Sequence, residues 1–571
     1  MADSKHSHLH SEAEKVWCIS IIALTVLVCW RFTQALSFNF TSRGAFPDLY
    51  EASVLELQKG LDEGQFSSVD LVKTYFARIE EVNLQGPALC AILELNPSSL
   101  SQAAALDKER KLKGKRSLLH GIPVLIKDII ATVSSEGMNT TAGSFGLLGS
   151  AVSKDAGVVK RLRKAGAIIL GKTNLSEFSD FRGNLTSGWS ARGGQCTGAY
   201  FPHADPCGSS AGSAVAASIG LAAVTLGSET DGSITCPAGN NNLVGIEPTL
   251  GLTSRAGVIP ISEHQDTIGP ITRSLADAAI VLSIISGRDP ADNYTFAQPP
   301  VVPDYTNALR KNSLKGKRIG VPRRVFMDNS IDTRDPYVVS AFERAIETIK
   351  RLGATVVDPA DLPSADEIAL AFPNETLVCA VDFKIQINAY FNSLLTNPTG
   401  VRSLADLITF NDAHPHIEKP DNFTSQSTLI ISETTNGRNA TFFKTLAYNK
   451  EIGATRGIDA ALDERMLDAL VLPAAGYSLA TTPAALAGYP IVTVPLGFYP
   501  STQPIRQAGP LTFYPAPGIP FGLSFIGTAF SEFELIGIAY AYEQRTKTRL
   551  TRRAFEAAIP KTQLKDVVGK H

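Results

Sequence analysis

Residues Cys207–Pro237 read C-G-S-S-A-G-S-A-V-A-A-S-I-G-L-A-A-V-T-L-G-S-E-T-D-G-S-I-T-C-P. No charged residue precedes Glu229 in this stretch, and most of its side chains are small. Such a segment can pack backbone against backbone and leave the hydroxyl groups of Ser209 and Ser233 facing a confined space. Glycine-rich turns at both ends allow main-chain N–H groups to point at a ligand. The stretch therefore predicts a buried site built from serine hydroxyls and main-chain donors.

Short apolar runs alternate with helical patterns on both sides of this stretch. Strands are expected at 121–129, 167–170, 221–226, 318–321, 354–357, 470–472 and 491–496, and helices within 49–82 and at 156–165, 211–220 and 337–352. Ser68 is placed to cap the second helix of the first pattern. The alternation predicts an α/β protein with a large, mainly buried sheet. Residues 391–435 look irregular and are expected to form an insertion at a substrate rim.

Composition sets the class of protein. The chain has 571 residues, of which 44% are hydrophobic and 19% charged, so it can bury a large core. A net charge of −2 gives no reason to expect nucleic acid as a partner. The sequence contains no Walker A motif and no zinc-type cysteine pairs, so we expect neither a metal nor another cofactor. The sequence is compatible with a homodimer.

The N-terminus carries one long apolar segment, Val16–Trp30, flanked by Lys15 and Arg31. Its length lies between a signal-peptide core and a membrane span, so residues 1–37 are interpreted as a tail with a signal peptide or with a membrane anchor through 16–32. A buried core helix is a third reading. Sequons favour the secretory pathway, with the catalytic domain secreted or anchored outside the cytosol. They lie at Asn39, Asn139, Asn174, Asn184, Asn293, Asn374, Asn422 and Asn439.

Lys127 interrupts the apolar run at 121–129 and has two readings. It can reach the surface or pair with Asp128, as most lysines in such a position would. Alternatively, burial can lower its pKa from about 10.4 to about 7, so that the neutral amine serves as a base. A Ser-Lys pair is a known variant of serine hydrolysis. Other motifs that suit serine hydrolysis accompany Lys127 in the sequence, and they favour the second reading.

Several motifs resemble the amidase signature family in that family's order. They are H-G-I-P-V-L-I-K-D at 120–128, G-K-T-N-L-S-E-F at 171–178, C-G-S-S-A-G-S at 207–213, G-S-E-T-D-G-S-I at 227–234, G-I-E-P-T at 245–249, A-G-Y-P-I-V-T-V-P-L-G at 487–497 and P-F-G-L-S-F-I-G at 520–527. The resemblance covers nearly everything after the leader. It implies one amidase domain over 48–560, with a large mixed sheet covered by helices on both faces.

The resemblance assigns catalytic roles residue by residue. Lys127 matches the family's catalytic lysine, and Ser209 matches the bridging serine, which in the family lies on an unusual cis peptide bond. Ser233 matches the nucleophile that forms the acyl-enzyme. The implied activity is hydrolysis of a linear carboxamide, such as a peptide amide or an acylamide. Neutral Lys127 would take a proton from Ser209, which takes one from Ser233 as it attacks the carbonyl.

The residues around Ser233 suggest an oxyanion site. The main-chain N–H groups of Thr230, Asp231, Gly232 and Ser233 can converge on a developing negative charge. Many family members have two glycines before the nucleophile, whereas here Asp231 stands in the first position. A carboxylate close to Lys127 would raise the pKa of the lysine, so that of Asp231 is expected to point away or to be hydrogen-bonded. The variant resembles the branch with bacterial peptide amidases and many fungal amidases.

Two other functions stay open at this point. The motif G-S-S-A-G at 208–212 fits G-x-S-x-G, which would make Ser210 the nucleophile of an esterase. The prolines within 200–207 argue against the strand that this motif requires. The chain also resembles the amidase component of a tRNA-dependent amidotransferase, which works within a complex. The predicted leader and the sequons argue against that reading.

Other polar and sulfur side chains near these motifs are expected to be structural. The sequence suggests turn hydrogen bonds and ion pairs for His120, Asp128, Glu177, Arg192 and Asp266. Cys207 and Cys236 lie beside the site serines, where we expect small buried side chains rather than redox control. The cysteine spacing permits a disulfide without requiring one.

Overall fold

The computed structural model describes residues 45–328, 335–476 and 478–569. The chain divides into two units, Met1–Phe46 and Pro47–His571, and the second carries all the elements discussed below. No helix among the described residues is both long and apolar enough to cross a bilayer. The predicted leader at 1–37, including the apolar segment at 16–32, lies outside the described residues.

The second unit is built on one mixed sheet of 11 strands in the order β1-β3-β2-β6-β8-β7-β12-β15-β11-β9-β10. In chain order the strands are β1 (Ile92–Leu95), β2 (Pro123–Lys127), β3 (Ile168–Thr173), β6 (Val224–Glu229), β7 (Val244–Glu247), β8 (Thr267–Thr272), β9 (Arg318–Gly320), β10 (Thr355–Val357), β11 (Ala469–Ala474), β12 (Ile491–Phe498) and β15 (Pro520–Ile526). Two short hairpins stand apart from it, β4 (Trp189–Ser190) with β5 (Gly194–Gln195), and β13 (Gln507–Gly509) with β14 (Thr512–Phe513).

Both parallel and antiparallel pairs occur along this sheet. Strand β2 runs parallel to both β3 and β6, whereas β6 runs antiparallel to β8. Every residue of β2, β3 and β6 is buried, as their continuous apolar sequences predict. Since the carboxyl ends of parallel strands meet at one edge of a sheet, Lys127 at the end of β2 lies beside Ser228 near the end of β6.

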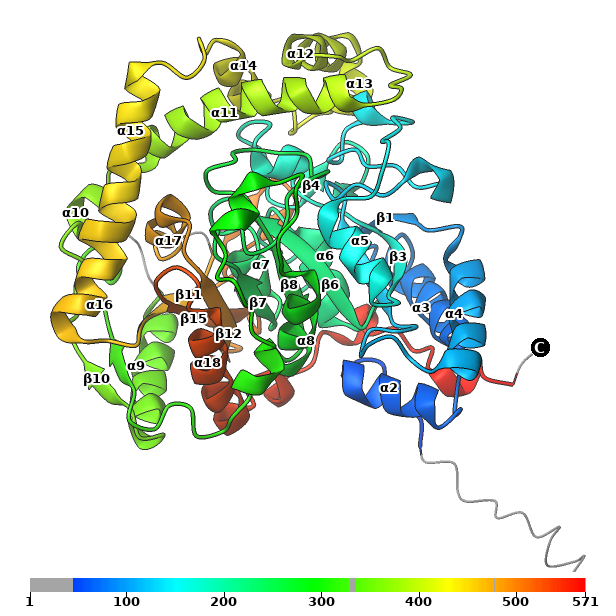
Figure 1. Cartoon of the computed structure of the whole chain (residues 1–571), viewed down its shortest axis with the longest axis horizontal. Helices are drawn as coiled ribbons and strands as arrows, with labels where there is room; N and C mark the ends of the chain where they lie inside the picture. The colour runs from blue at the N-terminus through cyan, green and yellow to red at the C-terminus, as the bar shows by residue number, and fades with distance from the viewer. Residues whose placement is uncertain (1–44, 329–334, 477, 570–571) are drawn as a thin grey trace, which may run out of the picture. The chain divides into compact units, whose positions relative to one another are not determined.

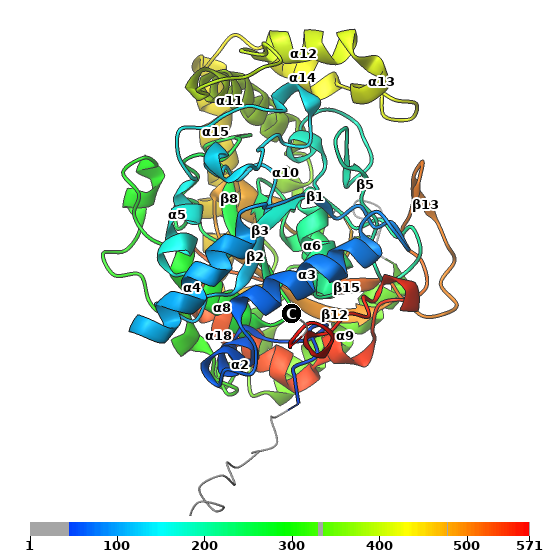
Figure 2. The same cartoon turned by 90° about the vertical axis from the view of Figure 1, so that its right-hand side faces the viewer.

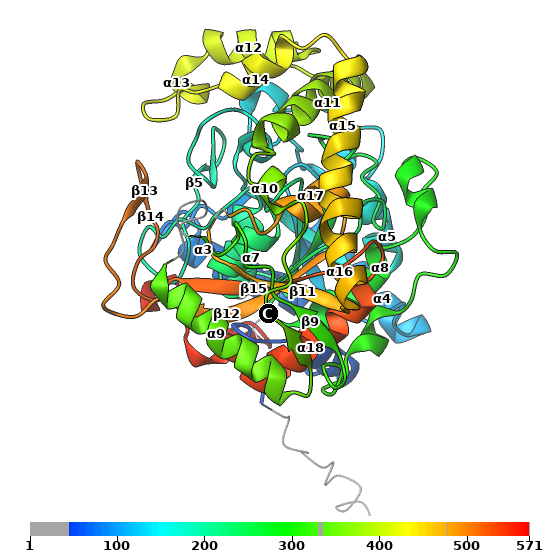
Figure 3. The same ribbon diagram turned by 90° about the vertical axis from the view of Figure 1, so that its left-hand side faces the viewer.

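Helices cover both faces of the sheet, which confirms the predicted α/β class. In Figure 3, α7 lies on one side of β12 and β15, while α9 and α18 lie on the other. Figure 2 shows α3 and α4 beside β2 and β3. The helices are α2 (Val54–Asp62), α3 (Ser68–Val82), α4 (Ser99–Lys113), α5 (Gly157–Lys164), α6 (Ala211–Ser218), α7 (Thr235–Asn240), α8 (Leu275–Ile285), α9 (Pro336–Arg351), α10 (Ala365–Ile368), α11 (Phe372–Ser393), α12 (Leu404–Ala413), α13 (Pro415–Glu418), α14 (Ser427–Glu433), α15 (Ala440–Lys450), α16 (Asp459–Arg465), α17 (Thr482–Ala487) and α18 (Glu532–Thr546).

Helices α11 to α14 lie together above the sheet in the view of Figure 1, and α15 runs down from this group towards α16. The longest of them, α11, packs against α14 and α15. The expectation of an irregular segment at 391–435 is therefore wrong, because this stretch holds α12, α13 and α14. Its polar residues include a helix cap, because the Ser403 side chain accepts from the Asp406 N–H at the start of α12.

Two local features, a helix cap and a close backbone contact, bear on predictions made from the sequence. The second helix is capped by Ser67 rather than Ser68, because the Ser67 side chain accepts from Asp70 N while Asp70 reaches back to the cap. In α6, a Cβ placed on Gly212 would lie 2.2 Å from Ala91 O and 2.6 Å from Asn174 N. Backbone therefore packs directly on backbone here, and this close approach requires the small residues of the Cys207–Pro237 stretch.

Candidate active site

Lys127 is fully buried at the end of β2, and its amine faces hydroxyl groups. Lys127 Nζ lies 2.6 Å from Ser209 Oγ and 2.8 Å from Ser228 Oγ. Burial lowers the pKa of Lys127 to about 7, although the negative charges of Asp180, Asp266 and Glu229 act in the opposite direction. An amine with this pKa is about half neutral near pH 7, and the neutral form can accept a proton from a hydroxyl group.

The alternative pairing of Lys127 with Asp128 does not occur. Asp128 Oδ2 instead accepts from Thr141 Oγ1 at 2.5 Å and from the main-chain N–H groups of Thr141 and Gly143. Arg192 lies 3.9 Å from the same oxygen. Asp128 therefore fixes a turn next to the site, which is the structural role that the sequence suggests for it.

Ser209 follows a cis Gly208–Ser209 peptide bond immediately before α6. The next residue, Ser210, connects the two serine-bearing segments, because its N–H donates to Ser233 O at 3.2 Å. Ser210 Oγ donates to Ser228 O at 3.1 Å and accepts from Ser228 N at 3.2 Å. Its hydroxyl is fully buried and bonded to the backbone, so the geometry does not favour Ser210 as an esterase nucleophile.

Ser233 lies in the turn between β6 and α7, and Glu229 holds that turn together. The Glu229 carboxylate accepts from the main-chain N–H groups of Gly232, Ile234 and Thr235 at 2.7–2.8 Å. It also accepts from Thr235 Oγ1 at 2.9 Å. Burial raises the pKa of Glu229 to about 7. Sequence reasoning missed this residue, although an acid buried between an apolar strand and a glycine turn was the signal.

The four predicted oxyanion donors do not all remain available. The Gly232 N–H is committed to Glu229 Oε1, so the prediction that it contributes to an oxyanion site needs correction. The N–H groups of Thr230, Asp231 and Ser233 donate to none of the described residues. The Asp231 carboxylate accepts from the hydroxyls of Thr481 and, at 2.9 Å, Thr482, as expected for a group held away from Lys127.

A disulfide joins Cys207 to Cys236, with their Cα atoms 5.9 Å apart. We expected two small buried side chains without a redox role, so this bond corrects that expectation. Cys207 lies just before the cis peptide and Cys236 lies in the first turn of α7. The bond therefore ties the segment before Ser209 to the segment after Ser233. Cys90, Cys196 and Cys379 are free.

No direct hydrogen bond joins Ser209 Oγ to Ser233 Oγ, both of which belong to described residues. Their segments are nevertheless connected by the Ser210 N–H bond to Ser233 O and by the disulfide. Ser233 is 7% exposed, whereas Lys127 and Ser209 are fully buried. Ser233 is thus the outermost of the three predicted catalytic residues. Hydrogen bonds between catalytic groups are often long before a substrate binds.

A cavity of about 490 Å³ opens onto Ser233. One side is formed by a stripe of α11 with helical spacing, Phe372, Glu375, Thr376 and Cys379. The cavity is further lined by Ser179, Asp180, Phe181, Thr230, Asp231, Ile261, Ile368, Ser478, Leu479, Thr481 and Thr482. None of residues 391–435, all of which the structure describes, lines it. The expected rim in that segment is therefore wrong, and the first two turns of α11 take its place.

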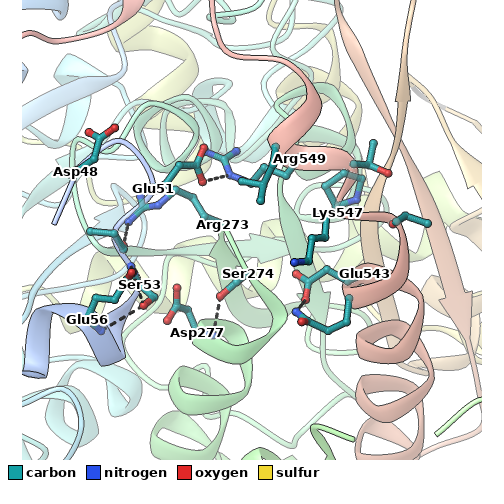
Figure 4. A pocket seen from close by; sticks show the side chains of 16 residues that line it. Asp48, Glu51, Ser53, Glu56, Arg273, Ser274, Asp277, Glu543, Lys547 and Arg549 are labelled. Carbon is teal, nitrogen blue, oxygen red and sulfur yellow. Dashed lines mark hydrogen bonds and ion pairs between the residues drawn. The ribbon is translucent and has the colours of Figure 1, made fainter. Parts of the chain in front are cut away.

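A second cavity, of about 430 Å³, lies between the start of α8 and the end of α18 (Figure 4). None of the predicted catalytic residues lines it. Two of its charged side chains have partners within the protein: Arg549 Nε donates to Glu51 Oε2 at 2.9 Å, and Asp277 Oδ1 accepts from Val54 N. The cavity at Ser233 is therefore the candidate substrate site.

The remaining acid–base residues near the motifs hold the structure together. Glu177 pairs with Arg182 at 2.7 Å, with both side chains fully buried. His120 Nε2 lies 3.0 Å from Leu106 O, far along the chain from the serines. Asp266 accepts from Thr230 Oγ1 at 2.7 Å. A second buried lysine that sequence reasoning missed, Lys172, donates to Ile130 O and Thr140 Oγ1.

Comparison with known proteins places this geometry in a family. The family model described as Amidase matches residues 70–536. The solved structure of a peptide amidase from Stenotrophomonas maltophilia is 42% identical and has a TM-score of 0.79, with 91% of this chain and 100% of that chain covered. The structure of an amidase family protein from Bacillus anthracis is 32% identical, with a TM-score of 0.76 and coverage of 90% and 93%.

A glutamyl-tRNA(Gln) amidotransferase component from Chloroflexus aurantiacus is also similar, at 33% identity over 519 residues. This match covers 88% of the present chain and 99% of that protein. The family model spans most of the chain. The sheet, the helices and the serine-bearing turns all belong to one unit. The chain therefore belongs to the Amidase family of hydrolases.

Proposed function

We propose that the protein hydrolyses linear carboxamides through an acyl-enzyme on Ser233. Neutral Lys127 takes the proton of Ser209, and Ser209 takes the proton of Ser233 as Ser233 Oγ attacks the carbonyl carbon. The C–N bond then breaks, and the relay runs in reverse to protonate the leaving amine. Water attacks the resulting ester along the same proton route and releases the carboxylic acid. No cofactor takes part in these steps.

Main-chain donors stabilise the charge that develops on the carbonyl oxygen. The N–H groups of Thr230, Asp231 and Ser233 donate to none of the described residues and lie in the turn that carries the nucleophile. Donors fixed in advance are worth more than mobile ones, because they need no reorganisation during the reaction. The bonds from this turn to Glu229 supply that rigidity.

The substrate class follows from the relatives that the chain resembles. At 42% identity, the similarity to a peptide amidase favours a peptide amide or a related acylamide over an ester. The amidotransferase component, at 33% identity, is the second candidate. That function requires partner proteins, so copurification with them would favour it.

The observation that carries the proposal is the buried contact between Lys127 Nζ and Ser209 Oγ at 2.6 Å. A fluorophosphonate probe tests it, since this reagent modifies only an activated serine. The wild type should incorporate the probe at Ser233 and release ammonia from primary amides. The Ser233→Ala variant should do neither. Labelling at Ser210, or turnover that survives Ser233→Ala, would contradict the proposal.

We further propose that the domain functions in the secretory pathway. The disulfide supports this location, because disulfides persist mainly in oxidising compartments. Asn293 and Asn422 are exposed, whereas Asn174 is fully buried and cannot carry a glycan in the folded protein. Glycosidase treatment of the natively expressed protein should shift its mass, with peptides containing Asn174 unmodified. An unshifted mass would argue against this location.

A further inference from the structure

Among the described residues, the cavity at Ser233 is lined by acidic side chains without basic ones. The acidic side chains among its described lining residues are Asp180, Asp231 and Glu375, and none of the lining residues is Lys, Arg or His. The rest of the lining is mainly apolar or hydroxylic, including the rings of Phe181 and Phe372. A low-dielectric cavity lined by one sign of charge attracts ligands of the opposite sign.

Glu375 is fixed in place rather than free to turn into solvent. It lies in the first turn of α11, half-buried, and its Oε1 accepts from Gln265 Nε2 at 2.7 Å. Gln265 Nε2 also donates to Thr230 O at 3.2 Å, so one amide group connects Glu375 to the nucleophile turn. Thr481 and Thr482 hold the Asp231 carboxylate in the same cavity.

The two carboxylates act on each other. Burial, and then the negative charge of Asp231, raise the pKa of Glu375 to about 8. A positive charge bound beside the two acids would lower the pKa of Glu375 again, because it offsets the lost solvation and the like-charge repulsion. Aromatic rings such as Phe181 and Phe372 can also attract a cation over their faces.

The size of the cavity indicates which part of a substrate it holds. A primary amide releases ammonia, which is far smaller than about 490 Å³, so the cavity has to accommodate the acyl part. We infer that this cavity selects carboxamides whose acyl part carries a protonated amine or a guanidinium group, with Glu375 as the specificity-determining residue. The inference rests on the proposed amidase function.

Matched substrates test the inference without any variant. Acetyl-lysinamide and acetyl-norleucinamide have side chains of similar length and differ by a terminal ammonium group. We expect kcat/KM of the wild type to favour the lysine compound by about 10-fold or more, since hydrogen bonds to charged groups contribute about 1.5–3 kcal/mol. The amide with an anionic side chain of similar length should be the poorest substrate.

The Glu375→Gln variant assigns the effect to one side chain. Glutamine retains an oxygen that can accept from Gln265, so the fold should persist while the ratio of the two kcat/KM values falls towards one. Asp366→Asn is the matched control, because Asp366 is exposed on α10 and lies outside the cavity lining. This control should retain the full preference.

The outcomes separate the two proposals. If the wild type hydrolyses both compounds equally well, or if Glu375→Gln retains the preference, the inference is wrong and the amidase function still holds. If neither compound nor any other amide is hydrolysed and Ser233 stays unlabelled, the proposed function fails and the inference falls with it. A preference that disappears only in Glu375→Gln supports both.

Discussion

Lys127 and Ser209 contact each other through a single short hydrogen bond, 2.6 Å from Nζ to Oγ, with both residues fully buried. The two residues lie 82 positions apart in the chain and are brought together by the parallel pairing of β2 with β6 and by the turn before α6. An amine at this depth loses much of its affinity for a proton, so the fold itself makes the lysine a base.

Replacing Lys127 by Met should abolish turnover while leaving the fold intact. Methionine fills the buried volume without a base, and we expect kcat to fall by about 10³-fold or more, as for other members of a concerted catalytic unit. Steady-state kinetics on a primary amide measure this loss. Circular dichroism of the variant controls for folding. A folded variant with a kcat near that of the wild type would rule out the relay.

The pH dependence of kcat/KM should show an ascending limb with a pKa near 7. The pKa of Lys127 is lowered to about 7, so the amine is protonated and inactive below that pH, and neutral above it. Activity should therefore rise through about pH 6–8 and then level off. A pH profile with a neutral substrate, in buffers of constant ionic strength, measures it. A limb near the ordinary lysine pKa of about 10.4 would indicate a lysine that stays charged.

Removing the hydroxyl of Ser210 should affect stability more than chemistry. Ser210→Ala leaves Ser228 N and Ser228 O without their buried partner, which should lower the free energy of unfolding by about 1–3 kcal/mol. Labelling of Ser233 by a fluorophosphonate should persist. Denaturant unfolding and probe incorporation are measured on the same preparation. Loss of labelling in a folded variant would revive the esterase reading.

Breaking the disulfide should loosen the site. The bond closes a loop with a sequence separation of 29, and its loss should lower the free energy of unfolding by about 3.6 kcal/mol. The double substitution of Cys207 and Cys236 by Ser should therefore show a lower Tm and a reduced kcat. Cys90→Ser is the control, because Cys90 is free. Equal Tm values for the double variant and the wild type would contradict this prediction.

Glu229→Gln should reduce kcat with little change in KM. Each carboxylate oxygen of Glu229 accepts two hydrogen bonds from the nucleophile turn. In the glutamine variant an NH₂ group replaces one of these oxygens, and because NH₂ is itself a donor it cannot accept the two bonds. The turn should shift, and we expect kcat to fall by about tenfold or more, since each misplaced donor costs over about 1 kcal/mol. Separate determination of kcat and KM tests this, because loss of substrate affinity alone would raise KM instead.

Much of the sheet could be predicted from the sequence because its strands are buried on both faces. Continuous apolar runs such as 121–129 and 221–226 overlap β2 and β6, with bounds that differ by a few residues. The strand β8 was harder to recognise, because its sequence T-I-G-P-I-T contains a glycine and a proline. Local pattern also failed at 391–435, where short helices without a strong apolar stripe resemble a loop.

The active site, like the fold, could be predicted from the sequence only in part. The small-residue stretch and Lys127 could be identified from their chemistry, whereas contacts between distant segments could not. Glu375 stands 142 positions after Ser233 in the chain (375 less 233), and no motif connects it to the nucleophile. Its place in the cavity depends on how α11 packs, which is a tertiary property. The commitment of the Gly232 N–H to Glu229 likewise depends on a side-chain rotamer that sequence does not specify.

The bifurcated amide of Gln265 has a practical consequence for protein engineering. Because one nitrogen contacts both the carbonyl of Thr230 and the acid on α11, a library randomised at position 265 would change selectivity and turnover together. Positions 372 and 376 line the same chamber on the same helix and take no part in this link, so diversification for new amides should begin there.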